Sequence, residues 1–151
     1  MDAFSQELNK LLSDAFWSVL KIEEQMAKMA AQGDLSISEL HLLEAVSKDE
    51  EQGRRISALA ADLKITLSSV TIAVNKLVKK GYVEKIRSEQ DGRQVFVKLT
   101  KLGRKVNAGH IYFHENMIRK LSDGMSEEEK EILVRAMVNL NQFFKRKLET
   151  R

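Results

Sequence analysis

The side chains best suited to chemistry lie on the polar face of a predicted helix at residues 66–80. This face carries small hydroxyl and amide groups at its beginning and lysines towards its end. Short polar side chains near a helix N-terminus can reach DNA base edges, the N–H groups there attract anions, and lysines suit phosphates. An ordinary solvent-facing helix surface is the alternative. The residues that we expect to contact DNA are Thr66, Ser68, Ser69, Thr71, Asn75, Lys76, Lys79 and Lys80.

A second polar group lies at a tight turn that follows this helix. Asp91 and Gly92 stand between two β-branched runs, which is a strong hairpin signal. Arg93 lies two residues beyond Asp91, so the carboxylate can accept a hydrogen bond from the guanidinium and hold it extended. Together with Arg87 it forms a basic hairpin tip that suits a narrow minor groove. The alternative is a surface ion pair worth about 0 to 1 kcal/mol.

The histidines offer a weaker signal. His110 and His114 are four residues apart, a spacing that lets two imidazoles bind one metal on a helix face. Cysteine is absent and His41 is the only other imidazole, so we predict no metal site and no cofactor. His110 shares an apolar stripe with Phe113, which favours a buried, hydrogen-bonded histidine. The sequence has no nucleophile elbow, phosphate loop or paired carboxylates, and we predict no enzymatic activity.

Charge is distributed unevenly along the chain. Residues 54–105 hold 13 lysines and arginines against 4 aspartates and glutamates, a balance of +9, whereas the remainder has a balance of −6. A basic segment between acidic flanks is typical of a surface that meets a polyanion. A merely solvated surface would mix the two signs.

Composition predicts one mainly helical domain. A chain of 151 residues with 43% hydrophobic residues can bury one core, and the absence of proline favours helices. Without cysteine, disulfides and thiolate metal sites are excluded. The N-terminus has no signal-peptide pattern, and no run of about 18 apolar residues occurs. We therefore expect a cytoplasmic protein with no membrane partner.

The period of the hydrophobic residues assigns the elements. Residues 82–87 and 95–99 alternate with a period of 2, as strands do, and residues 47–54 form a charged loop. Ser36 with Glu39, and Ser126 with Glu129, have capping-box spacing. A period of 3.6 predicts helices at residues 4–29, 36–46, 56–63, 66–80, 100–121 and 126–148, the first ending near Gly33. Two short helices followed by a hairpin form a winged helix.

The predicted fold is thus mainly α with a small β-hairpin wing, in a single domain over residues 1–151. The winged helix-turn-helix core takes about residues 36–99, and dimerisation helices occupy about residues 1–32 and 100–151. The first and last helices carry apolar stripes wider than one small helix-turn-helix can cover. This favours a homodimer with intertwined terminal helices over a monomer in which both stripes are core.

Residues 59–104 resemble the winged-helix core of the multiple-antibiotic-resistance regulator (MarR) family. The wing pattern D-x-R-x-x-x-x-x-L-T is carried by Asp91, Arg93, Leu99 and Thr100, with Gly103 just after. With the flanking helices, the resemblance covers essentially the whole chain. It implies a dimeric repressor on a pseudo-palindromic double-stranded operator, with Arg93 in the minor groove. The further DNA contacts that it implies are those of Ser68, Ser69, Thr71, Asn75 and Lys76.

One position departs from that family. Ile72 stands where many members have an arginine, so their phosphate contact does not carry over.

A narrower resemblance is to the fatty-acid-synthesis repressors of lactic bacteria and streptococci. The matching segments are residues 22–24, 36–41, 86–91, 113–114 and 123–129. This resemblance implies a long-chain acyl group on acyl carrier protein as the corepressor, and fatty-acid synthesis genes as targets. We expect a cleft for the chain, with a histidine on its carbonyl or thioester end and flexible methionines beside it. Its expected lining is Phe16, Trp17, Met26, Met29, His41, His110, Phe113, His114 and Met117.

Three alternatives remain beside that hypothesis. The effector can be a small aromatic or phenolic acid that releases the repressor. The winged helix can serve as a protein-interaction module, although the basic wing tip argues against it. A metal-responsive regulator that uses His110 and His114 is the third alternative.

Overall fold

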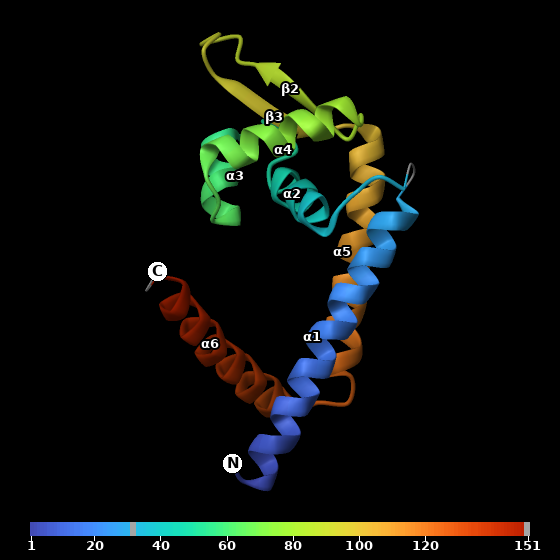
Figure 1. The fold of residues 1–151 in the computed structure, drawn as a ribbon, viewed down its shortest axis with the longest axis vertical. Helices are drawn as coiled ribbons and strands as arrows, with labels where there is room; N and C mark the ends of the chain where they lie inside the picture. Colours follow the sequence, from blue (N-terminus) through green and yellow to red (C-terminus); the bar gives the residue numbers. More distant parts are fainter. Residues whose placement is uncertain (31–32, 150–151) are drawn as a thin grey trace. The chain divides into compact units, whose positions relative to one another are not determined.

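The computed structural model describes residues 1–30 and 33–149, which form six helices and three strands in two compact units. The first unit is Met1–Tyr112, and the second begins at Phe113. In chain order the elements are α1 (Ala3–Met29), α2 (Ile37–Ser47), β1 (Arg54–Arg55), α3 (Ile56–Leu63), α4 (Leu67–Lys79), β2 (Val83–Arg87), β3 (Val95–Leu99), α5 (Lys101–Ser122) and α6 (Glu127–Glu149). The predicted mainly helical fold with a small hairpin is confirmed (Figure 1).

Helices α3 and α4 form the helix-turn-helix of the first unit, and α2 precedes them. The predicted capping box at α2 is present: the Ser36 hydroxyl accepts from the Glu39 N–H at 3.2 Å, and the Glu39 carboxylate accepts from the Ser36 N–H at 2.8 Å. Lys64 ends α3 in the left-handed conformation, with φ of 54°. Thr66 then caps α4 by accepting from the Ser69 N–H at 3.2 Å. These local signals place α4 across the end of α3.

The apolar core of the first unit lies beneath α4. Helices and strands of this unit contribute aliphatic side chains to the core. Burial of their apolar surface away from water is the main force that holds these elements together. The most deeply buried of them, at 0 to 2% exposure, include Leu40 and Leu43 of α2, Leu59 of α3, Val70, Val74 and Leu77 of α4, and Val83 and Val97 of the sheet.

The sheet is antiparallel with strand order β1–β3–β2. The predicted hairpin pairs Val83 with Leu99 and Arg87 with Val95, so the wing is confirmed (Figure 1). The third strand, β1, pairs Arg54 with Val97. Sequence patterning placed these residues at the end of a charged loop, because a two-residue strand shows no alternation.

Gly103 sets how closely α5 approaches the hairpin. Thr100 donates its N–H to the Tyr82 carbonyl at 3.0 Å, and its hydroxyl donates to the Gly81 carbonyl at 2.7 Å. A Cβ atom added at Gly103 would lie 2.0 Å from the Tyr82 carbonyl oxygen. Any side chain there would push the first turn of α5 off the sheet, which explains the glycine after the wing pattern.

Helix α1 of the first unit is capped by Asp2. Its carboxylate accepts from the Ser5 N–H at 2.7 Å, and this bond holds the pKa of Asp2 below its usual range. Glu23 and Ala27 are the buried residues of α1. Most of its predicted apolar stripe is exposed, including Phe4 at 71% and Met29 at 84%.

The second unit contains the end of α5 and all of α6. The second predicted capping box is confirmed, because Ser126 and Glu129 exchange hydrogen bonds of 2.7 and 3.2 Å. Every residue of α6 is described, and none is buried. The exposed apolar residues of α6 are Ile132, Val134, Met137, Val138, Phe143, Phe144 and Leu148.

Among the described residues, no single helix has both the length and the apolar character needed to cross a membrane. The bent pair α3 and α4, which meet at 110°, satisfies those two criteria only when both helices are taken together.

Candidate nucleic-acid interface

The start of α4 presents a cluster of hydroxyl groups to solvent. Thr66 Oγ1 lies 3.1 Å from Ser68 Oγ and donates to Ser69 Oγ at 2.8 Å. Thr71, one turn later, donates its hydroxyl to the Leu67 carbonyl at 2.8 Å. Three of these four side chains are exposed and Thr71 is half-buried, so the surface that a DNA groove would meet is polar and short.

The second half of α4 carries its amide and its lysines. Lys76 and Lys79 are exposed, whereas the Asn75 side-chain oxygen accepts a hydrogen bond from Lys85 of β2. Lys80 turns away from this surface: it forms an ion pair with Glu39 at 2.9 Å and donates to the Asp34 carbonyl. The expected DNA contact of Lys80 is therefore corrected to a contact that joins the end of α4 to α2.

Apolar side chains lie among these polar groups. Ile65, Leu67 and Ile72 are 46%, 57% and 58% exposed. Ile72, the position that departs from the family pattern, thus presents a branched alkyl group on the solvent side of α4. A thymine methyl group is the part of a major groove that such a side chain fits.

The wing tip is ordered by hydrogen bonds around Asp91. Its carboxylate accepts from the backbone N–H of Arg93 at 3.1 Å and from the Gln94 side chain at 3.3 Å. Gln94 in turn accepts from Arg55 of β1 at 2.6 Å. The predicted bond from the Arg93 guanidinium to Asp91 is replaced by this backbone bond, because an aspartate two residues earlier closes an Asx turn. Arg93 and Arg87 remain exposed cations at the tip.

An ion-pair network lies behind β1. Asp62 of α3 contacts Lys48 and Arg54, each at 3.0 Å. Hydrogen bonds from Lys48 and Arg54 hold the pKa of Asp62 below its usual range, and the bond from Lys48 has the larger effect. Arg54 also donates to the Ala45 carbonyl at 2.9 Å, so it joins β1 to α2.

The residues expected to bind an effector are distributed over both units. In the first unit Phe16, Trp17 and Met29 are exposed, Met26 packs against the core, His41 is exposed and His110 is fully buried. Phe113, His114 and Met117 lie in the second unit and are half-buried, with the Phe113 and His114 rings 5.1 Å apart. Each unit thus contains part of the expected set.

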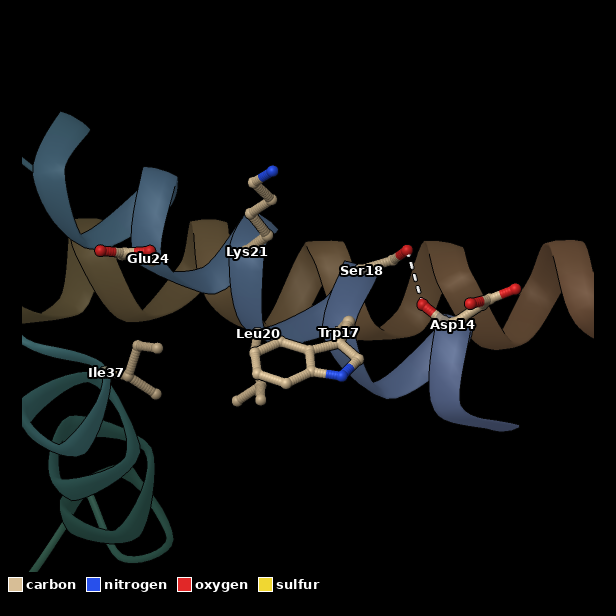
Figure 2. Close-up of a pocket in the computed structure, with 7 residues that line it drawn as sticks. All are labelled: Asp14, Trp17, Ser18, Leu20, Lys21, Glu24 and Ile37. Carbon is tan, nitrogen blue, oxygen red and sulfur yellow. Dashed lines mark hydrogen bonds between the residues drawn. The ribbon is translucent and has the colours of Figure 1, made fainter. Parts of the chain in front are cut away.

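A groove between α1 and α2 includes one of these residues. Figure 2 shows Trp17 and Leu20 extending from α1 on the side where Ile37 of α2 lies, while Lys21 points away. The other residues that line it are Asp14, Ser18 and Glu24. The groove therefore combines an apolar wall with a polar rim.

One buried carboxylate was missed by sequence patterning. Glu23 is 3% exposed, and its Oε1 atom lies 2.9 Å from His110 Nε2 and 3.3 Å from His41 Nε2. The prediction that His110 is a buried, hydrogen-bonded histidine is confirmed. The sequence carries no local signal for Glu23; in the structure it is buried together with Ala27, four residues later on the same face of α1.

A helix-turn-helix with exposed polar groups on α4, joined to a hairpin with a cationic tip, defines a winged-helix DNA-binding protein. The family model described as "Transcriptional regulator SarA/Rot" matches residues 25–109. The structure of Streptococcus pneumoniae FabT in complex with DNA is 38% identical, covers 93% of this chain and 97% of that one, and has a TM-score of 0.79. The chain belongs to the MarR family of winged-helix transcriptional regulators.

Two further proteins show a similar fold or sequence. The fold of MarR from Oenococcus oeni matches with a TM-score of 0.66 and 20% identity, covering 89% of this chain and 98% of that one. The HTH-type regulator YhjH of Bacillus subtilis is 24% identical over 102 residues, which are 66% of this chain. The chain spans 57% of the length of that relative. The proteins that the chain resembles are transcriptional regulators, as expected for a protein without enzymatic activity.

Proposed function

We propose that this regulator is a homodimeric repressor of fatty-acid synthesis genes that binds a pseudo-palindromic DNA operator. The observation that supports it most is the 38% identity to FabT, a protein whose structure includes DNA, over 93% of this chain. The exposed residues of α4 are proposed to enter the major groove. The proposed contacts are those of Thr66, Ser68, Ser69, Thr71, Asn75, Lys76 and Lys79, with Arg87 and Arg93 of the wing in or near the minor groove, and Asp91 ordering the tip.

The proposed dimer follows from the apolar side chains that the chain leaves exposed. Phe4, Leu8 and Leu11 of α1 are 71%, 43% and 57% exposed, and α6 exposes seven large apolar side chains of its own. Two-fold pairing of both terminal helices with a second copy would cover these stripes. Each copy would then present one α4 to one half-site, with half-sites about 34 Å apart.

The proposed corepressor is a long-chain acyl group carried by acyl carrier protein. His110 is hydrogen-bonded to Glu23, so its Nε2 atom is not available to an acyl carbonyl in this structure. The proposed site for the acyl chain is therefore the apolar wall formed by Trp17, Leu20 and Ile37. A corepressor acts only if it binds the DNA-competent conformer more tightly than the other. Two alternatives must be distinguished from this proposal. In the first, a small aromatic acid releases the repressor from DNA. In the second, the winged helix binds a protein instead of DNA.

The test measures DNA affinity with and without acyl carrier protein loaded with a long acyl chain. The duplex is one that the protein itself selects from a random pool. We expect the acyl protein to tighten binding at least tenfold for the native chain and less than twofold for Trp17→Ala, with Ile22→Ala as a matched exposed control on α1. If the acyl protein leaves the DNA affinity of the native chain unchanged, the proposal of an acyl corepressor is wrong. If the protein selects no duplex from the pool, the proposal that it is a repressor is wrong.

A further inference from the structure

Three helices of the first unit converge on one cluster of ligand-type side chains. Glu23 comes from α1, His41 from α2 and His110 from α5. One ligand atom from each residue lies within 4.8 Å of those from the other two. The rings of His41 and His110 lie 5.6 Å apart. Two imidazoles and one carboxylate are the protein ligand set of many zinc sites.

The cluster is built largely inside the protein. The side chains of Glu23 and His110 are 3% and 1% exposed, whereas His41 is 44% exposed and closes the cluster on the solvent side. A carboxylate buried to this degree is costly unless cations or hydrogen-bond donors surround it. Both imidazole Nε2 atoms are directed at the same oxygen of Glu23.

The spacing of the ligand atoms is close to that of a tetrahedral zinc ion. With zinc bonds of about 2.0 to 2.1 Å, adjacent ligand atoms lie about 3.3 Å apart. The distances from Glu23 Oε1 to His41 Nε2 and His110 Nε2 are 3.3 and 2.9 Å. Both distances are within a few tenths of an ångström of that spacing.

Glu44 lies beside the second ring nitrogen of His110. Its carboxylate is 3.3 Å from His110 Nδ1. A neutral imidazole whose Nε2 binds a metal carries its one N–H at Nδ1, where a nearby carboxylate can accept it. A carboxylate on the second nitrogen of a metal-bound histidine is a common arrangement at zinc sites.

We propose that Glu23, His41 and His110 bind one zinc ion per chain, with Glu44 orienting His110. Water or a fourth donor completes the tetrahedron. The ion fastens α1 and α5 to α2, the helix whose Glu39 holds Lys80 at the end of α4. Zinc therefore stabilises the first unit that carries the DNA-binding elements. The three zinc ligands do not line the groove in Figure 2, although His41 and His110 belong to the lining that the sequence predicts for an acyl chain.

The test uses the full chain without a histidine tag, treated with a chelator and then titrated with zinc in a calorimeter. We expect one zinc ion per chain and a rise in the melting temperature, because a ligand that binds only the folded state stabilises it. Cobalt in place of zinc should give the visible absorption of a tetrahedral site. Zinc binding that is absent, or that leaves the melting temperature unchanged, would contradict the proposal.

Variants separate this site from adventitious binding. Glu23→Gln keeps the shape of the side chain and His41→Gln changes an exposed ligand, so neither should unfold the chain. We expect each to weaken zinc binding at least tenfold, and Glu44→Gln to weaken it less. Glu24→Gln, the adjacent exposed carboxylate that pairs with Lys28, is the matched control and should bind zinc normally. If Glu23→Gln and His41→Gln bind zinc as the native chain does, the three residues form a hydrogen-bonded cluster only.

Discussion

The winged-helix core and the terminal helices of this chain bury their apolar side chains to very different degrees. In the core, Leu43, Leu59 and Val74 are fully buried, whereas in α6 Ile132 and Leu148 are 58% and 67% exposed. Helices in both regions carry apolar side chains, but α6 also carries many charged residues. The difference shows that the core completes its packing within one chain, while the terminal helices present surfaces that a second surface can cover.

The largest expected effect is on the stability of the core. Leu43→Ala should cost about 2 to 5 kcal/mol of unfolding free energy, because it leaves a cavity among packed side chains. Ile65→Ala, an exposed position in the same region, should cost less than about 0.5 kcal/mol. Urea unfolding followed by circular dichroism measures both. Equal costs would show that the core is not closed within one chain.

The next effect concerns the exposed stripe of α6. Ile132→Asp should weaken self-association at least tenfold, or about 1.4 kcal/mol, because it places a carboxylate in an apolar contact. Glu131→Ala, an exposed neighbour, should leave association unchanged. Sedimentation equilibrium measures the two variants. Native-like association of Ile132→Asp would exclude this stripe from the interface.

The wing should affect DNA binding without affecting assembly. Arg93→Ala should lose about 1 to 3 kcal/mol of DNA-binding free energy, the range found for arginines that read a groove. Glu89→Ala, an exposed residue of the same turn, is the control. Fluorescence anisotropy at several salt concentrations measures the loss. Unchanged affinity of Arg93→Ala would remove the wing from the interface.

The smallest effect is a dependence of core stability on acidic pH. Lys48 and Arg54 lower the folded-state pKa of Asp62 below its usual value of 3.8, so its ion pairs stabilise the fold above that pH. This stabilisation is lost as the pH falls through the lower, folded-state pKa. Asp62→Asn should therefore flatten the decline of the melting temperature below about pH 4. A decline as steep as that of the native chain would contradict this assignment.

The elements of the fold could be predicted where a local signal decides the structure. The pairs Ser36 with Glu39 and Ser126 with Glu129 began two helices as expected, because a capping box uses atoms only three residues apart. The strand β1 could not be predicted, since its pairing with Val97 of β3 is a long-range contact.

The site residues show the same limit. The exposed hydroxyls of α4 followed from helical periodicity, whereas the contact of Lys80 with Glu39 joins positions far apart in the chain. Glu23 was missed for the same reason, because a glutamate is assigned to solvent unless its partners are known. Those partners, His41 and His110, come from two other helices.

The measurement that tests the central claim most directly is the stoichiometry of the DNA complex. Sedimentation velocity would be run on the free chain and on the chain with its selected duplex. We expect a free species of about twice the 17.2 kDa chain mass, and two chains bound per duplex. A free species of 17.2 kDa at micromolar concentration, or one chain per duplex, would contradict the account.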